Sequence, residues 1–293
     1  CYTNLVNPYK IEGPALISFS GGRTSGYMLY HIIQAHNGKL PKDLYVIFAN
    51  TGKECPETLD FVNDCQEKWG VEIAWLEFDW HGGDKQITKI VDYSTASRNG
   101  EPFTKMIEYF KTRTELNTPG KYDKDSALLP NPVARFCTDK LKIVRINSYM
   151  KQQGLKIYDT VLGLRYDEPR RVAKQKTKNT QKKFNLTPLY DAKATKQDVN
   201  DFWRKQNFDL NLPIIDNETP HGNCDLCFLK SRKKINQIIK EDKSKAEWWA
   251  KTEENFNNRF RADRPSYREL ITLVDVQQEF PFDDDNMDCF CHD

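Results

Sequence analysis

The sequence predicts an α/β fold, in which a doubly wound parallel sheet carries a C-terminal helical, cysteine-bearing appendage. Two observations predict it. Short apolar runs alternate with helical patterns from residue 14 to residue 164, and after residue 219 the pattern changes to helices with interleaved charges. Strands that alternate with helices indicate a parallel sheet covered on both faces. Such sheets bind ligands at the carboxyl ends of their strands, where the strand order reverses.

Four apolar runs are the expected strands. The first, 14–19, is separated by the segment SGGRTSG from an amphipathic helix, and the second, 43–50, ends at Thr51-Gly52. A helix with Pro at its start and Gly at its end, PETLDFVNDCQEKWG, follows the second run. The third and fourth runs are 72–79 and 157–164. Polar, Gly-containing sequence follows the runs at 14, 43 and 157, and we expect the chemistry there.

The chain divides into an expected α/β domain, 1–218, and a cysteine-bearing helical segment, 219–293. Residues 94–134 fit the strand–helix alternation poorly, because a helix-like stretch precedes a Pro- and Gly-bearing one. Two interpretations are open for them: an insertion that covers the site as a lid, or a plain surface excursion. Trp248 and Trp249 lie at helical spacing with alanines, which indicates packing.

Composition limits the class of protein. Lys and Arg number 44 and Asp and Glu 42, a net charge of +2, so a basic coat over the whole surface for nucleic acid is not supported. No apolar stretch approaches the length that spans a bilayer. The first residues lack the basic-then-apolar pattern of a secretion signal. We therefore expect a cytoplasmic protein without a membrane partner, whose eight cysteines are reduced thiols or metal ligands.

The segment SFSGGRTSG, at 18–26, is typical of phosphate binding. Small residues let backbone N–H groups approach a phosphate, and the N-terminus of the following helix adds a favourable dipole. Arg23 can add positive charge. The residues expected around the phosphate are Ser20, Gly21, Gly22, Thr24 and Ser25. No GK[ST] follows, so the segment does not match the Walker pattern, and an ordinary Gly-rich turn is the alternative.

A basic run occupies residues 170–183, with seven Lys or Arg in fourteen residues and no acid. A flexible, solvated loop is one interpretation. A clamp for a polyphosphate or a nucleic-acid backbone is the other. The run contains no aromatic residue to stack on bases, which favours the loop.

The cysteines give the sharpest signal for a metal. Cys224 and Cys227 form a CxxC, which places two thiols on one tight turn, the usual half of a zinc or iron–sulfur site. Cys289 and Cys291 lie in the terminal sequence DCFCHD, among six acids in the last fifteen residues. Acids raise the pKa of a thiol, which favours a ligand role there over nucleophilic attack. Two histidines lie near cysteines and could supply a fourth ligand, His221 and His292.

Four segments, in order, resemble the phosphoadenylyl-sulfate (PAPS) reductase family of the adenine-nucleotide α-hydrolase-like, or PP-loop, superfamily. They are SGGRTS, ANTGKECPETLDF, GLRYDEPRR and TPLYDAKATKQDVNDFW, and the resemblance covers residues 14 to about 230. PP-loop pyrophosphatases usually carry SGGxDS. Thr24 stands here in place of that Asp, which argues against standard cleavage of ATP between its α and β phosphates. The resemblance implies ATP, adenylyl sulfate (APS) or PAPS as the small-molecule ligand.

The resemblance also implies roles for individual residues. The residues implied at the nucleotide, beyond the Gly-rich loop, are Thr51, Gly52, Lys142 and Gly163. It implies that phosphate or sulfate is bound by Arg165 together with Arg170 or Arg171. Asp167 and Glu168 would be catalytic carboxylates that orient these arginines.

The same resemblance bears on the cysteines. Cys137 lies in a cysteine-bearing segment like one of the family, so with the CxxC it would give three ligands of a [4Fe–4S] cluster, and Cys291 or Cys289 a fourth. The terminal DCFCH also overlays the family's ECGxH ending, with Cys289 as a nucleophile toward sulfate sulfur.

We therefore expect an enzyme that uses an adenine nucleotide for sulfur chemistry, with an iron–sulfur cluster. In one form it reduces APS or PAPS to sulfite with a thiol donor. In another, ATP activates a nucleic-acid substrate and sulfur from a donor protein is transferred to it. The remaining alternative is a zinc-stapled nucleic-acid-binding module without catalysis, which the basic run and the sequence LKSRKK (229–234) motivate.

Overall fold

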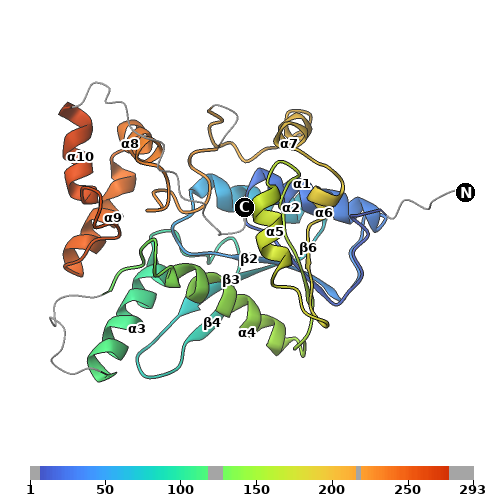
Figure 1. The fold of residues 1–293 in the computed structure, drawn as a ribbon, viewed down its shortest axis with the longest axis horizontal. Coiled ribbons are helices and arrows are strands. Elements are labelled where there is room, and N and C mark those ends of the chain that lie inside the picture. The colour runs from blue at the N-terminus through green and yellow to red at the C-terminus, as the bar shows by residue number, and fades with distance from the viewer. Residues whose placement is uncertain (1–6, 118–127, 216–218, 277–293) are drawn as a thin grey trace, which may run out of the picture.

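A computed structural model describes residues 7–117, 128–215 and 219–276. Its centre is a six-stranded sheet in the order β4-β3-β2-β1-β5-β6 (Figure 1). The neighbouring strands are parallel except β3 and β4, which are antiparallel. The chain leaves β1 toward β2 on one side and returns to β5 on the other, so the strand order reverses at β1. The strands are β1 (Ala15–Ser18), β2 (Leu44–Ala49), β3 (Ile73–Asp79), β4 (Ile87–Val91), β5 (Asp159–Val161) and β6 (Asn185–Leu186).

The four predicted strands are confirmed as β1, β2, β3 and β5. β1 is buried along its whole length, as expected for a central parallel strand whose sequence is a continuous apolar run. The sequence did not predict β4 and β6. β4 is an edge strand in which Ile90 is exposed and lysine interrupts the apolar pattern, and β6 has only two residues.

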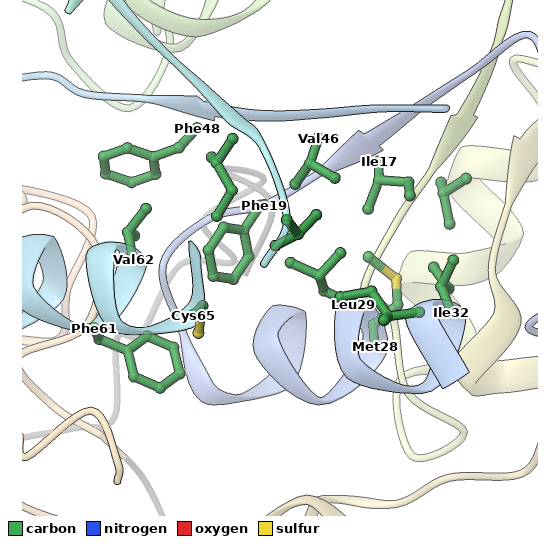
Figure 2. Close-up of a cluster of buried hydrophobic side chains, with 14 of the residues drawn as sticks. Ile17, Phe19, Met28, Leu29, Ile32, Val46, Phe48, Phe61, Val62 and Cys65 are labelled. Carbon is green, nitrogen blue, oxygen red and sulfur yellow. The ribbon is translucent and has the colours of Figure 1, made fainter. Parts of the chain in front are cut away.

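Helices cover both faces of the sheet. On one face, α1 (Arg23–Ala35) and α2 (Pro56–Trp69) pack against alternate residues of β1 and β2, with α7 (Lys196–Trp203) against α1. Figure 2 shows this core, to which α1 contributes Leu29 and α2 contributes Phe61, Val62 and the buried Cys65, and Phe19 packs against Phe61. Pro56 begins α2 and Gly70, at φ 59°, follows its last residue, as predicted.

The other face is covered by α3 (Glu101–Asn117), the π-helix η1 (Thr138–Ile143) and α4 (Val144–Gln152). Two short helices, α5 (Pro169–Lys176) and α6 (Pro188–Asp191), flank β5 and β6. α5 occupies the first part of the basic run, where a loop was expected, because its Val172 and Gln175 are buried while its basic residues face outward.

The C-terminal region is helical, as predicted: α8 (Arg232–Glu241), α9 (Ser244–Asn255) and α10 (Tyr267–Val276). These helices lie beside α3 (left in Figure 1) and share one hydrophobic cluster with it, in which Phe103 and Met106 of α3 meet Trp249 and Phe260. The helical part of the 94–134 segment therefore packs into this cluster through Phe103, Met106 and Ile107. None of the helices that the structure describes is both long enough and apolar enough to cross a bilayer.

Candidate active site

A cavity of ≈ 330 Å³ lies where the strand order reverses, between the sheet and η1, α4 and α5. Leu16, Ile47 and Leu162 of the sheet contribute apolar surface to it. Its polar groups are Ser18, Ser20, Thr138, Lys142, Asn147, Tyr158, Thr160, Gln175, Lys178, Lys183 and Asn185. No Asp or Glu is among the described residues that line it. Apolar surface bordered by ammonium and amide groups suits a flat base that carries phosphates.

The Gly-rich loop joins β1 to α1 at the mouth of this cavity. Ser20 lines the cavity, whereas Ser25 is buried within the loop. The Ser25 hydroxyl accepts a hydrogen bond from the Ser20 N–H (3.3 Å) and donates one to the Gly22 carbonyl (3.0 Å). Ser25 therefore holds the loop in shape, and Gly22 is the N-cap of α1.

The two loop glycines have different surroundings. Gly21 has φ +77°, and a Cβ added to it would lie 2.7 Å from Thr58 Cγ2 of α2. Gly22 has φ −99°, and the nearest atom to an added Cβ would be Ser20 Oγ at 3.6 Å. Backbone conformation and packing therefore both require glycine at position 21. The space beside Gly22, in contrast, is open to a ligand.

Arg23 differs from its expected place at a phosphate. Its Nε and Nη2 donate to the two carboxylate oxygens of Asp209 (2.7 and 2.6 Å), and its Nη1 donates to Thr219 Oγ1 (3.0 Å). The side chain is 7% exposed and does not line the cavity. Arg23 instead ties the start of α1 to the 209–219 segment, which leaves the positive charge at the loop to other residues.

Arg165 places a positive charge beside the Gly-rich loop. It follows β5, and its Nη1 donates to Thr24 Oγ1 (3.0 Å) across the point where the strand order reverses. Asp167 Oδ1 accepts from its Nε (3.0 Å), and Glu168 Oε2 accepts from its backbone N–H (3.0 Å). The GLRYDE sequence thus orients one guanidinium toward the Gly-rich loop.

The other residues of this motif lie around Arg165. Arg171 pairs with Glu168 from the first turn of α5. Arg170 is exposed on the outer side of α5. Gly163 is buried between β5 and Arg165 and does not line the cavity.

The π-helix η1 connects the cavity with a cysteine. It begins directly after Cys137, and its Thr138 and Lys142 line the cavity. Cys137 packs against the hydrophobic cluster that contains Cys224 and Cys227. Single π-helical turns often occur at functional sites.

Thr51 and Gly52, expected at the nucleotide, are buried and do not line the cavity. They face the CxxC loop instead. Thr51 Oγ1 lies 3.4 Å from Cys224 Sγ, and Glu54 forms an isolated antiparallel bridge with Cys224. The turn after β2 therefore holds the CxxC against the carboxyl edge of the sheet.

A buried ion pair strengthens this attachment. Lys53 Nζ lies 3.0 Å from Asp225 Oδ2, and the two side chains are 8% and 10% exposed. Trp249 Nε1 donates to Asp225 Oδ1 (2.8 Å), and Lys53 Nζ lies 4.9 Å from the centroid of the Trp248 ring. The two tryptophans thus pack, as predicted, but the sequence did not single out Lys53 or Asp225, which lie inside motifs noted for other residues.

The described cysteines do not form a complete metal site. Cys224 and Cys227 are buried on one turn, as the CxxC predicts. Nevertheless, among residues 7–117, 128–215 and 219–276, no group of three or more His, Cys, Asp or Glu side chains is placed to hold a metal ion. Cys289, Cys291 and His292 lie outside the described residues. The described thiols therefore account for two ligands of a metal site, Cys224 and Cys227, both from one turn.

Two further groups near the CxxC have shifted pKa values. Burial raises the pKa of the Cys55 thiol to about 11, which opposes a nucleophilic role. Burial also lowers the pKa of His221, whose Nε2 lies 2.8 Å from Glu241 Oε2. The Nδ1 of His221 is buried without a hydrogen-bond partner.

These features define an α/β protein with a phosphate-type loop, an arginine facing that loop and a cysteine pair at the same edge of the sheet. Residues 14–218 match the model of the phosphoadenosine phosphosulfate reductase domain family, and the chain belongs to this family. Membership makes it a nucleotide-binding protein of sulfur chemistry.

Individual relatives are similar over different lengths. "Uncharacterized nin region protein ORF290" of Escherichia phage lambda is 31% identical over 234 residues, 78% of this chain and 70% of that protein. "Uncharacterized protein MJ0066" of Methanocaldococcus jannaschii is 32% identical over 108 residues, 34% of this chain and 21% of that protein. Among solved structures, the U34-tRNA thiolase NcsA from Methanococcus maripaludis with its [4Fe-4S] cluster aligns with a TM-score of 0.39 and 15% identity, over 89% of this chain and 71% of that one.

Proposed function

We propose that this protein is an enzyme that binds an adenine nucleotide, ATP or a sulfonucleotide, with the phosphates between the Gly-rich loop and Arg165 and the base in the cavity. The observation that carries the proposal is the contact of Arg165 Nη1 with Thr24 Oγ1, 3.0 Å. It brings the segments after β1 and β5 together beside a cavity lined by Lys142, Lys178 and Lys183. Family membership supplies the class of ligand.

Each group has a defined task in this proposal. The backbone N–H groups at Gly22 and the first turn of α1 donate to phosphate oxygens, and the helix dipole favours the negative charge there. Arg165 adds a guanidinium that Asp167 and Glu168 already orient, so little side-chain freedom is lost on binding. Lys142 adds a second positive charge from η1.

Arg165→Ala tests the proposal, with Arg165→Lys as the matched variant. Loss of a charged hydrogen-bond donor is expected to weaken binding of ATP, APS or PAPS by about tenfold to about a hundredfold, and binding of adenosine much less. Arg165→Lys should recover part of the affinity, because it keeps the charge but not the planar fork. Calorimetric titration measures both. Equal losses for adenosine and for the phosphorylated ligands would make Arg165 a structural residue and remove the proposal's main support.

We propose further that Cys137, Cys224 and Cys227 are ligands of an iron–sulfur cluster. The support is the donor set, thiols without a histidine pair, and the hydrophobic cluster that contains Cys224 and Cys227 and against which Cys137 packs. Iron and sulfide analysis after anaerobic purification tests it, with Cys65→Ala as a buried cysteine control and Cys224→Ala as the ligand variant. Iron and sulfide lost only in the Cys224 variant support the cluster. Zinc without sulfide would instead favour the zinc-stapled module.

A further inference from the structure

The basic run presents a charged outer face through α5. Arg170 and Lys174 are exposed on this helix, and the Lys176 side chain is 47% exposed, while Val172 and Gln175 point inward. Between residues 165 and 191 there are eight Lys or Arg and three acids, a local charge of +5 in a chain of net charge +2. The positive charge is therefore concentrated here.

The structure brings aromatic rings to this charge, although the basic run itself contains none. Tyr166 is 46% exposed, and its ring centroid lies 5.3 Å from that of Tyr190, with 40° between the ring planes. Lys176 Nζ lies 5.4 Å from the centroid of the Tyr190 ring. Tyr190 comes from α6, whose last residue, Asp191, lies 3.7 Å from Lys176 of α5. An exposed ring beside lysines is what base stacking on a polynucleotide requires.

Two of the three acids pair with arginines outside this outer face, Asp167 with Arg165 and Glu168 with Arg171, whereas Asp191 lies 3.7 Å from Lys176. The net charge of the segment stays positive after all three acids are counted. Tyr166 directly follows Arg165, so a base stacked on its ring would lie beside the site proposed for the nucleotide phosphates.

We propose that the α5 face, defined as Tyr166, Arg170, Lys174, Lys176 and Tyr190, binds an unpaired polynucleotide strand. This inference goes beyond the proposed function and does not depend on it. Lysines and arginine contact phosphates, which are regularly spaced along the strand, and Tyr166 stacks on a base. The strand is unpaired because stacked bases inside a duplex do not offer their faces to a side chain.

Binding is measured by fluorescence anisotropy with labelled oligodeoxythymidylate and oligouridylate of about 12 nucleotides, and with a duplex of equal length. The protein is expected to bind the unpaired probes more tightly than the duplex. Tyr166→Ala should weaken binding by about fivefold to about a hundredfold, the effect of losing one base stack, and Tyr166→Phe should retain it. A plot of log affinity against log salt concentration has a negative slope. In the double variant Arg170→Ala with Lys174→Ala, the magnitude of this slope should fall by about 0.7 for each phosphate that the variant no longer neutralises.

The matched control is Lys39→Ala with Lys42→Ala, two exposed lysines beside the amino ends of the strands. An equal loss in this control would show attraction to charge in general and overturn the proposal, as would tighter binding of the duplex. ATP titration of the same variants separates this proposal from the proposed function. Retained ATP affinity with lost probe binding supports the α5 face, whereas lost ATP affinity in Tyr166→Ala would place that ring in the nucleotide cavity instead.

Discussion

The two glycines at the start of α1 make the loop testable at the level of single residues. The space beside Gly22 is open apart from Ser20 Oγ, and its φ is one that any residue adopts. We therefore predict that Gly22→Val folds normally but loses adenine-nucleotide binding, because the branched side chain occupies the position of the phosphate. Thermal unfolding and ATP titration of the same sample measure the two effects. Full ATP affinity in this variant would show that no phosphate lies there.

Gly21→Ala provides the contrast. The positive φ and the 2.7 Å approach to Thr58 Cγ2 both oppose a side chain. The left-handed backbone costs about 1 kcal/mol for a residue other than Gly, and overpacking adds about 1 to 3 kcal/mol. We expect the unfolding free energy to fall by about 2 kcal/mol or more, measured by urea denaturation.

The contacts of some of these residues could be predicted from the sequence and those of others could not, for a physical reason. Arg165 could be predicted to approach the loop because it directly follows the predicted strand 157–164, and the carboxyl ends of parallel strands meet at one edge. Arg23 could not be predicted, because its partner Asp209 is 186 residues away and lies in no motif. Local patterns place a residue on an element, but they do not show which distant group it meets.

At the level of elements, the turn after β2 and the CxxC loop form one unit through the Lys53–Asp225 pair. We predict that Asp225→Asn, which keeps an acceptor for Trp249 but removes the charge, costs about 3 to 5 kcal/mol of unfolding free energy, because Lys53 is left buried and unpaired. Adding Lys53→Met should recover part of the loss. Urea denaturation measures the free energies, and faster alkylation of the CxxC in the single variant would show loosening of the loop. A change below about 1 kcal/mol would mean that the pair is solvated.

Helix α1 carries a half-buried histidine that links stability to pH. His31 lies among Tyr9, Tyr27, Tyr30 and Phe202, and its Nε2 is buried without a hydrogen-bond partner. Burial lowers the pKa of His31, so the unfolded chain binds its proton more readily than the folded chain does. This contribution to stability is complete above the unfolded pKa of about 6.5 and is lost as the pH falls below it.

We therefore predict that the unfolding free energy falls between about pH 7 and about pH 5, and that His31→Phe falls less over the same range. Urea denaturation at both pH values gives the comparison, and other titrating groups cancel in the difference between the two proteins. Identical pH dependence in the variant would contradict the assignment.

The long, periodic elements could be predicted from the sequence and the short ones could not. The central strands are continuous apolar runs, and α2 has Pro and Gly at its ends, so each carries its own signal. β6 has two residues, and its position depends on pairing with β5. α5 is an eight-residue helix inside a run of charges, and its position depends on the packing of Val172 with Leu162 and Leu164. The aromatic residues beside α5 come from separate segments, which is why sequence alone favoured a solvated loop.

On the scale of the whole molecule, the C-terminal helices and α3 share a core, and that core brings the CxxC to the carboxyl edge of the sheet. The Gly-rich loop and Arg165 lie at the same edge, where the parallel strands β1, β2 and β5 end. The arrangement places segments as distant as residues 20 and 227, the phosphate-type loop and the thiol pair, at one edge of one sheet. The helical region thus holds the CxxC at this edge.

The central claim is that an adenine nucleotide binds at this edge, and a crystal structure of the full chain with ATP or APS tests it most directly. We predict that phosphate oxygens lie within about 3 Å of the backbone N–H of Gly22 and of the Arg165 guanidinium. The adenine is expected in the cavity beside Lys142. A nucleotide bound elsewhere on the protein, with the Arg165–Thr24 contact undisturbed and the cavity empty, would contradict it.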